Sequence, residues 1–380
     1  MRLMKRRTIS VVMILLVLLT TGALVTPCAL AAGQEPDTVI ASIPVGPLPF
    51  GLAYDSDNGL LYAAVLNASR VSVIDASTFA IVENVTVAYP NEVAFDPANG
   101  DIYVTGATGV AVIDGSTNTV VANLTLGFFT EGMAYDPANG EIYVARAGMS
   151  SNAPPPGVET INCTTNTVIE NLPLGVDYFR AAYDGANGDV YLTYSNGNSG
   201  NVVILNGSNN VIVENMTIGP ASLGVAYDPA NGDVYVAGSN SVAVFDGYTD
   251  RLVTSVSVGL APFDMAVDPV ADDVYVGLAN SSAFSSSPSY VGVIDGSTNL
   301  LSGEIAIGKG GVGSLAFDPS NGYLYVANPF SNSILVIPTS VQPPNAPGWV
   351  ILAIPGVAVV FGILALAFGR RHDDRVRPTR

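Results

Sequence analysis

A short pattern that recurs along most of the chain constrains the fold more than any other feature. Its clearest copy, residues 95–105, has the sequence FDPANGDIYVT, and similar copies return at intervals of 40 to 50 residues. The repeated Asp marks each copy: Asp55, Asp96, Asp136, Asp184, Asp228, Asp268 and Asp318. Repeats of this length made of strand-forming halves are typical of β-propellers, whose blades are four-stranded sheets.

Each copy predicts a β-hairpin. Asp96 and Pro97 favour the start of a turn, because Pro fixes φ at the second turn position and the Asp side chain accepts backbone amide protons. Gly100 supplies the left-handed conformation that ends the turn, and the β-forming residues 102–104 follow. Residues 110–127 predict a second hairpin around the turn sequence DGSTN. Two hairpins per repeat give one blade, whose strands we call a to d from the axis outward.

The two ends of the repeat region are incomplete in complementary ways. Residues 38–46 match the fourth strand of a blade that lacks its first three, whereas residues 333–339 form a third strand with no fourth strand after it. Pairing these two segments would close the ring and remove two exposed sheet edges. The sequence therefore predicts an all-β fold, a seven-bladed β-propeller within residues 33–340, in which the N-terminal strand completes the last blade.

The segments outside the propeller predict secretion and membrane attachment. Residues 1–32 combine a basic start, an apolar stretch and a small-residue cleavage site, as a secretory signal peptide does. A lipid anchor on Cys28 and an uncleaved N-terminal anchor are the alternatives. Residues 341–348 form a stiff, Pro-rich linker. Residues 349–368 carry no charge and are long enough for one transmembrane helix, although a buried core helix would have a similar composition.

The charges that flank this apolar segment predict an orientation. The tail, residues 369–380, carries five of the 14 basic residues, and such tails stay in the cytoplasm. The expected location is the cell membrane, with a single pass, an extracellular propeller and a cytoplasmic C-terminus. Because the last strand of the propeller runs toward the DPANGD turns, the chain should leave on that face, which we call the turn face. The eight-residue linker would then hold the turn face near the membrane and direct the opposite face outward.

The distribution of charge excludes one large class of partner. Between its basic ends the chain carries 30 of its 32 acidic residues but only five basic ones. Nucleic acids are bound through cationic contacts to phosphate, so no nucleic-acid partner is expected. The acidic turns could attract Ca²⁺ weakly, with Asp55 and Asp57 as the best candidates. Turn formation alone explains these residues, so we expect no specific metal site.

Few residues are available for catalysis. The only His is His372, in the basic tail, so the propeller can contain neither a Ser–His–Asp triad nor a His-ligated metal. Cys163 is the one Cys beyond the N-terminal segment, which leaves it without a disulfide partner, and no basic neighbour in sequence activates its thiol. We therefore expect no cofactor and assign no catalytic residue.

Three segments resemble the motif of the YVTN-type β-propeller repeat family: IYVTG at residues 102–106, YVAN at residues 325–328 and DGSTNTVV at residues 114–121. The resemblance covers roughly residues 38–340. It implies a propeller in a secreted or cell-surface protein of a prokaryote, such as a surface-layer-like protein. These motifs are structural, so the resemblance implies a fold and a location but no activity.

Seven Asn-x-Ser/Thr sequons are candidates for N-glycosylation. They are Asn67, Asn84, Asn123, Asn162, Asn206, Asn215 and Asn280. Three of them, Asn84, Asn123 and Asn215, hold the same position of strand d, where a glycan would face solvent and block edge pairing. Copying of the repeat would produce the same register without any modification, so the pattern leaves both explanations open.

The loops before strand a and between strands b and c vary most between repeats. In a propeller both sets lie on one face, around the channel mouth, where the candidate ligand contacts are Glu92, Glu131, Tyr178, Phe179, Arg180, Phe263 and Asp264. Mixed aromatic and acidic rims suit carbohydrate or peptide ligands. We therefore expect a non-enzymatic surface protein that binds glycans, peptides or neighbouring envelope proteins. The alternative is an extracytoplasmic hydrolase or lyase in which Glu92 and Glu131 act as acid and base.

Overall fold

The computed structural model describes residues 37–126, 129–147, 155–196, 199–219, 223–280 and 287–339, together with the backbone of residues 349–354 and 357–362. The chain divides into two units, Met1–Gln34 and Glu35–Arg380, and the propeller lies in the second. The predicted signal peptide, linker and cytoplasmic tail lie outside the described residues, so their assignment remains a prediction.

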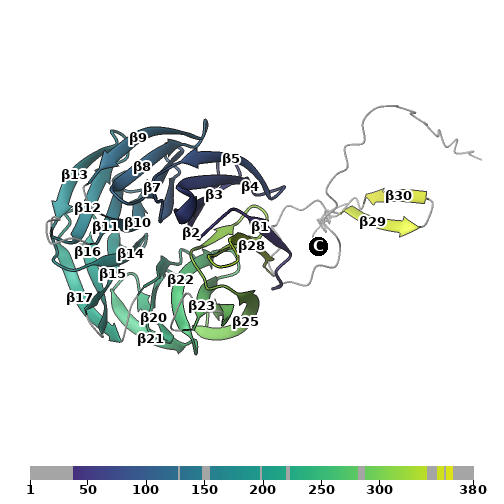
Figure 1. The fold of residues 1–380 in the computed structure, drawn as a ribbon. Helices are drawn as coiled ribbons and strands as arrows, with labels where there is room; N and C mark the ends of the chain where they lie inside the picture. The colour runs from purple at the N-terminus through teal and green to yellow at the C-terminus, as the bar shows by residue number, and fades with distance from the viewer. Residues whose placement is uncertain are drawn as a thin grey trace, which may run out of the picture. The chain divides into compact units, whose positions relative to one another are not determined.

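In the described part of the chain, seven four-stranded antiparallel sheets form the blades of a propeller (Figure 1). Blades 1 and 2 contain β2 (Pro49–Asp55), β3 (Leu60–Val65), β4 (Arg70–Asp75), β5 (Ala80–Thr86), β6 (Val93–Asp96), β7 (Asp101–Thr105), β8 (Gly109–Asp114) and β9 (Thr119–Thr125). Blades 3 and 4 contain β10 (Thr130–Asp136), β11 (Glu141–Arg146), β12 (Gly157–Asn162), β13 (Thr167–Leu172), β14 (Tyr178–Tyr183), β15 (Asp189–Asn196), β16 (Ser199–Asn206) and β17 (Ile212–Gly219). Blades 5 and 6 contain β18 (Val225–Tyr227), β19 (Asp233–Ala237), β20 (Ser241–Asp246), β21 (Arg251–Ser257), β22 (Ala261–Asp268), β23 (Asp273–Ala279), β24 (Pro288–Asp295) and β25 (Leu300–Lys309). Blade 7 contains β26 (Leu315–Asp318), β27 (Tyr323–Asn328), β28 (Ser333–Pro338) and β1 (Ala41–Pro44).

The two middle strands of each blade are almost fully buried. In β7 and β27, for example, every residue after the first is buried, because neighbouring blades cover both faces of the sheet. Such strands consist of nearly continuous Val, Ile, Ala and Tyr instead of alternating polar and apolar residues. The outermost strand faces solvent on one side, and β9 accordingly alternates between exposed and half-buried residues. The hydrophobic core is thus a ring of clusters, each shared by two adjacent blades.

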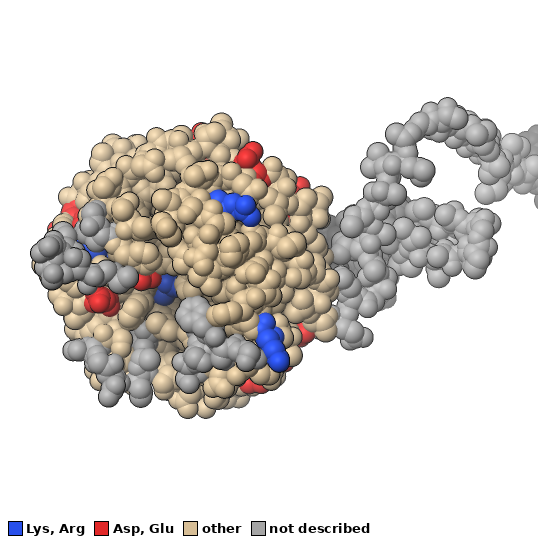
Figure 2. Space-filling model, in the orientation of Figure 1, with Lys and Arg blue, Asp and Glu red and all other residues tan. Residues whose placement is uncertain are grey.

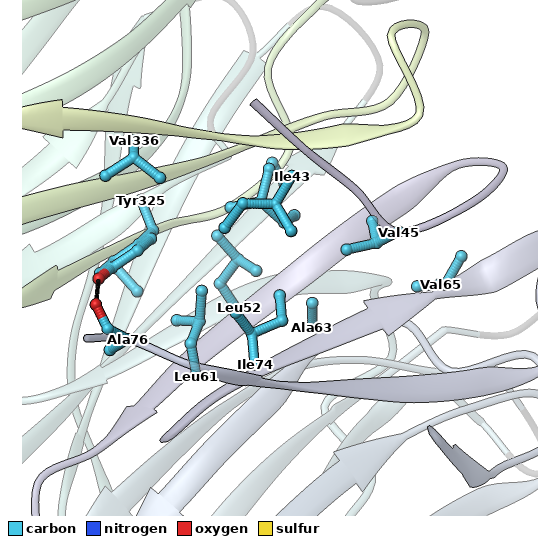
Figure 3. Packing of buried hydrophobic residues seen from close by; sticks show 13 residues of the cluster. Ile43, Val45, Leu52, Leu61, Ala63, Val65, Ile74, Ala76, Tyr325 and Val336 are labelled. Atoms are coloured by element: carbon cyan, nitrogen blue, oxygen red, sulfur yellow. Dashed lines mark hydrogen bonds between the residues drawn. The ribbon is translucent and has the colours of Figure 1, made fainter. Parts of the chain in front are cut away.

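The N-terminal strand closes the ring, as the sequence predicts. Strand β1 pairs with β28 from Ala41, opposite Val336, to Pro44, opposite Ser333. Ile43 is buried in a cluster that joins blade 7 to residues such as Leu52 of blade 1 (Figure 3). The last blade is therefore built from both ends of the propeller chain, which leaves no incomplete sheet.

The Tyr of the repeated motif has a structural role that explains its recurrence. The Tyr103 hydroxyl donates to Asn166 Oδ1 (2.6 Å) in the c–d turn of the next blade, and Tyr143 donates to Asn210 Oδ1 (2.8 Å) in the same way. The equivalent bonds join Tyr62 to Asn118, Tyr191 to Asp250, Tyr235 to Asn299 and Tyr325 to the Ala76 carbonyl (Figure 3). Each hydroxyl satisfies a buried polar group and fixes the spacing of two blades.

The C-terminal apolar segment differs from the prediction. Where the structure describes residues 349–368, it contains strands β29 (Trp349–Ile354) and β30 (Val357–Gly362), paired as an antiparallel hairpin, and not the expected helix. Val and Ile favour strands, so the composition of this segment is compatible with a hairpin. Among the described residues, no helix has the length and apolar character needed to cross a membrane.

Candidate functional site

The entrance to the channel is built at the start of the innermost strands. The residues five positions before each repeated Asp form what we call the mouth ring: Phe50, Asn91, Glu131, Phe179, Leu223, Phe263 and Gly313. The residues four positions before it form the charged ring: Gly51, Glu92, Gly132, Arg180, Gly224, Asp264 and Ser314. β-Bulges interrupt the register here in β2, β10, β14 and β22. A bulge re-aims side chains, so these positions need not follow the ordinary alternation of a strand.

Glycines and charged residues alternate between neighbouring blades in the charged ring. A Cβ atom on Gly132 would lie 2.6 Å from the Cα of Arg180, and one on Gly224 would lie 2.9 Å from the Cα of Asp264. A Cβ on Gly51 would be equally close to the charged residue of blade 2. Glycine is therefore required at these positions, because the backbones of adjacent blades approach too closely for any side chain.

Arg180 reaches across the channel. It starts from β14 in blade 4, yet its Cζ lies 5.7 Å from the ring centroid of Phe50 in blade 1, and its Nη2 lies 3.4 Å from Glu92 Oε2 in blade 2. Its Nη1 also donates to the Phe179 carbonyl (3.2 Å). In Figure 2, basic and acidic atoms lie side by side in a recess near the middle of the propeller face in view. The guanidinium thus contacts residues of blades 1, 2 and 4 at the inner ends of their first strands.

Three carboxylates from different blades surround this guanidinium. Asp264 Oδ2 accepts a hydrogen bond from the Leu315 amide (3.1 Å), and Glu131 Oε2 accepts one from Asn91 Nδ2 (2.9 Å). Glu92 Oε1 accepts only a long bond from its neighbouring amide (3.3 Å), and the buried Glu92 Oε2 accepts none. At 3.4 Å, therefore, Arg180 and Glu92 form an ion pair without an aligned hydrogen bond.

Burial and crowding shift the pKa values of these groups. Burial raises the pKa of Glu92 to about 7; Arg180 opposes this shift, and Asp264 adds to it. Burial also raises the pKa of Asp264 and of Glu131, again against the effect of Arg180. Burial alone would lower the pKa of Arg180, but the three carboxylates raise it on balance, so the guanidinium stays charged. The site therefore combines one charged guanidinium with three carboxyl groups, of which Glu92 titrates near neutral pH.

The structure brings together most, but not all, of the residues predicted from the loops. Glu92, Glu131, Arg180 and Asp264 meet in the channel, and Phe179 and Phe263 are half-buried members of the mouth ring. Tyr178 is not at the mouth: its side chain is buried between blades 3 and 4, with its ring 5.4 Å from that of Tyr194. The loop argument missed Phe50 and did not single out Asn91. Aligning the repeats on their Asp would have found both, because they occupy the same column as Phe179 and Phe263.

The other candidate sites have ordinary structural explanations. Asp55 Oδ1 accepts the Asp57 amide (2.9 Å), as the repeated Asp does in the other turns. No group of three or more His, Cys, Asp or Glu residues in the described part of the chain is arranged to hold a metal ion. Cys163 is buried, and burial raises the pKa of its thiol to about 12. A thiol of this kind is a packing residue, not a nucleophile.

The sequons fall into two groups in the structure. Asn67, Asn84, Asn123, Asn215 and Asn280 are exposed. Asn162 and Asn206 are half-buried, and their side-chain oxygens accept hydrogen bonds from Thr165 and Ser208 within their own turns. The first group is accessible to a modifying enzyme. In the second group, modification of the side-chain nitrogen of Asn206 would remove the hydrogen bond that its Nδ2 donates to Asp189 Oδ1 (3.2 Å).

The comparisons with known proteins establish the fold alone. No protein-family model matches the chain, and no curated protein matches its sequence. Among solved structures, a chain of "Kuenenia stuttgartiensis Hydrazine Synthase" is similar with a TM-score of 0.67 and 18% identity, covering 78% of this chain and 97% of that chain. A chain of "Crystal Structure of Mitotic Checkpoint Complex" is similar with a TM-score of 0.65 and 14% identity, covering 86% of this chain and 99% of that chain. Such distant similarity supports the β-propeller architecture and carries no function.

Proposed function

We propose that this protein is a non-enzymatic, cell-surface β-propeller of the YVTN repeat type that binds its ligand at the mouth ring. The observation that carries the proposal is the Arg180 guanidinium, which lies over the ring of Phe50, one of three half-buried Phe residues of the mouth ring. The entrance therefore presents aromatic side chains next to a cluster of charged groups. This combination suits glycans, peptides or the loops of neighbouring envelope proteins.

The mouth can be tested by mutation. In the full-length protein, Phe263→Ala should weaken ligand binding by about 10-fold, a typical loss for an aromatic contact residue at a binding site. The matched control is Tyr248→Ala, which removes an exposed aromatic side chain from the turn at the opposite end of blade 5. Binding would be measured calorimetrically against panels of glycans and peptides. Equal affinity of wild-type protein and Phe263→Ala for every bound ligand would rule out the mouth as the recognition site.

One observation favours a second function. A pKa of about 7 for Glu92 is suited to a general acid, and Glu131 is a carboxylate in a different environment nearby. This would make the protein an extracytoplasmic hydrolase or lyase. Binding remains the better proposal, because Glu92 is buried and paired with Arg180. Turnover of a bound glycan or peptide that disappears in both Glu92→Gln and Glu131→Gln would establish the enzyme instead.

We further propose that the apolar segment 349–368 attaches the propeller to the cell membrane, with the turn face inward. The Thr339 amide donates to the Gly322 carbonyl (2.9 Å) in a DPSNG turn, so the last described residue of the propeller lies on the turn face. In a bilayer, an isolated hairpin would leave its edge amides and carbonyls unpaired, which favours a transmembrane helix there. The exposed sequons would then carry glycans on the extracellular side.

Fractionation of native cells tests this attachment. The full chain should sediment with membranes, whereas a chain ending at Thr339 should be released. On intact cells, a thiol reagent should label Asp177→Cys, on the face opposite the turn face, faster than Ala98→Cys on the turn face. Both positions are exposed, but in the proposed orientation only Asp177 faces outward. Release of the full chain, or the reverse order of labelling, would contradict the proposal. If the mass of the native protein did not change after deglycosylation, glycosylation of the sequons would be excluded, but the proposed membrane attachment would not be affected.

A further inference from the structure

We propose that the ligand bound at the mouth is cationic: a Lys or Arg side chain presented by a peptide or protein segment. This inference rests on the proposed function, since it assigns a ligand class to the mouth. The chemistry at the mouth combines aromatic rings with carboxylates. That combination is the ordinary recognition chemistry for ammonium and guanidinium groups.

The protein's own Arg180 shows how the site holds a cation. Its guanidinium lies against the face of an aromatic ring, that of Phe50, and beside a carboxylate, that of Glu92. Phe179 and Phe263 hold the same repeat position as Phe50 and are half-buried, so they offer similar rings at the mouth. A cation from a ligand could therefore lie against Phe179 or Phe263 of the mouth ring as the Arg180 guanidinium lies against Phe50.

Negative charge remains after Arg180 is accounted for. The guanidinium faces Glu92, Glu131 and Asp264, and its single charge offsets only one carboxylate. A proton on Glu92, whose pKa burial raises to about 7, would still leave one carboxylate uncompensated. Glu92 is 7% exposed, and its Oε2 is buried and accepts no hydrogen bond from any described group. A buried acceptor left without a hydrogen bond is unfavourable unless a ligand or a proton satisfies it. Asp177, exposed at the start of blade 4, adds negative charge beside Glu131.

The same geometry disfavours an anionic ligand. Arg180 is the only cation among the described groups of this site, and its side chain is 14% exposed. An incoming carboxylate or phosphate would approach a guanidinium that already faces Glu92, Asp264 and Glu131. Like charges at such close range repel strongly in a partly buried site. Acidic peptides and phosphorylated ligands are therefore expected to bind least.

The test uses the full-length protein and three short peptides at physiological salt. The peptides have one central residue flanked by glycines, with Lys, Glu or the neutral analogue norleucine at the centre. Calorimetry should show that the Lys peptide binds at least about 10-fold more tightly than the norleucine peptide, and that the Glu peptide binds least. Glu131→Gln and Phe263→Ala should each weaken Lys-peptide binding by roughly 3- to 30-fold, the range of a partly desolvated cation–π or charge-assisted contact.

Matched controls separate the mouth from the general acidity of the chain. Glu214→Gln removes an exposed carboxylate from the outer strand β17, and Tyr248→Ala removes an exposed aromatic side chain. Neither should change Lys-peptide binding. The inference fails if Glu214→Gln weakens binding as much as Glu131→Gln, or if the norleucine peptide binds as well as the Lys peptide. If a neutral glycan bound in a Phe263-dependent way and the Lys peptide did not, the ligand would not be cationic, but the proposed binding function would stand. If no glycan or peptide bound in a Phe263-dependent way, both proposals would fail.

Discussion

Deleting residues 37–46, in a chain that keeps residues 1–36, is expected to lower the melting temperature of the propeller by on the order of 10 °C. The deletion removes Ile43 and Val45 from the core and exposes the apolar edge of β28. Burying each of these side chains contributes roughly 1.5–3 kcal/mol. A loss of several kcal/mol corresponds to about 2–4 °C per kcal/mol in a domain of this size. The exposed edge should also promote aggregation.

Single substitutions in the same strand separate closure from a general effect of the N-terminus. Ile43→Asn places an amide in the cluster shared by blades 7 and 1, whereas Ser42→Asn changes the exposed neighbour. Thermal unfolding followed by circular dichroism should show a large decrease for Ile43→Asn and almost none for Ser42→Asn. If the deletion melted at the wild-type temperature, β1 would not be the strand that stabilises blade 7.

The fold could be predicted from the sequence because its determinants are local and repeated. The turn at Asp96 and the strand after it are specified within about ten residues, and the other copies confirm the pattern. The closure of the ring could be predicted because residues 38–46 match a fourth strand and residues 333–339 lack one. The contribution of Tyr103 to blade spacing did not follow, since its partner Asn166 belongs to the next blade and only the structure brings them together. The apolar C-terminal segment was predicted from composition, which cannot distinguish helix from strand.

The site was predictable in part, for a different reason. Variable loops indicated Glu92, Glu131 and Asp264, and these residues do meet. The decisive contact is between Arg180 in blade 4 and Phe50 in blade 1, which come together only because the ring closes. No spacing within one repeat encodes such a contact. Aligning the repeats on their Asp would have identified the mouth-ring position that Phe50 occupies. It would not have shown that the Arg180 side chain points toward Phe50.

The second large effect expected is a decrease in stability as pH rises. Several Asp residues at the turn face are buried close to one another. Burial, with repulsion from Asp250, Asp189 and Asp246, raises the pKa of Asp184 to about 7, and burial with Asp250 raises that of Asp189 to about 6. Burial and Asp272 likewise raise the pKa of Asp228 to about 6. Two of the charged neighbours stand where most other repeats have Asn or Gly: Asp250 replaces Asn, and Asp272 replaces Gly.

The sign of the pH dependence follows from these shifts. In the unfolded chain an Asp has a pKa near 3.8, so between about pH 4 and pH 7 the folded protein binds more protons than the unfolded one. The free energy of unfolding must then fall as pH rises through this range. Glu92, with a pKa of about 7, acts in the same direction. Half-buried Asp75 has a pKa lowered mainly by its hydrogen bond from Ser77, and it acts in the opposite direction, but only near and below its ordinary range. The melting temperature should be several degrees higher at pH 5 than at pH 8.

A substitution already present in the other repeats tests the cause. Asp250→Asn keeps the acceptor for the Tyr191 hydroxyl, as Asn210 does for Tyr143, but removes the charge beside Asp189. It should raise the stability at pH 8 by on the order of 1 kcal/mol, equivalent to about one pKa unit of repulsion, and reduce the difference between pH 5 and pH 8. Glu214→Gln, on the exposed outer strand, should change neither. If Asp250→Asn destabilised the protein at pH 8, the carboxylate would be favourable there, and repulsion between buried Asp residues could not explain the pH dependence.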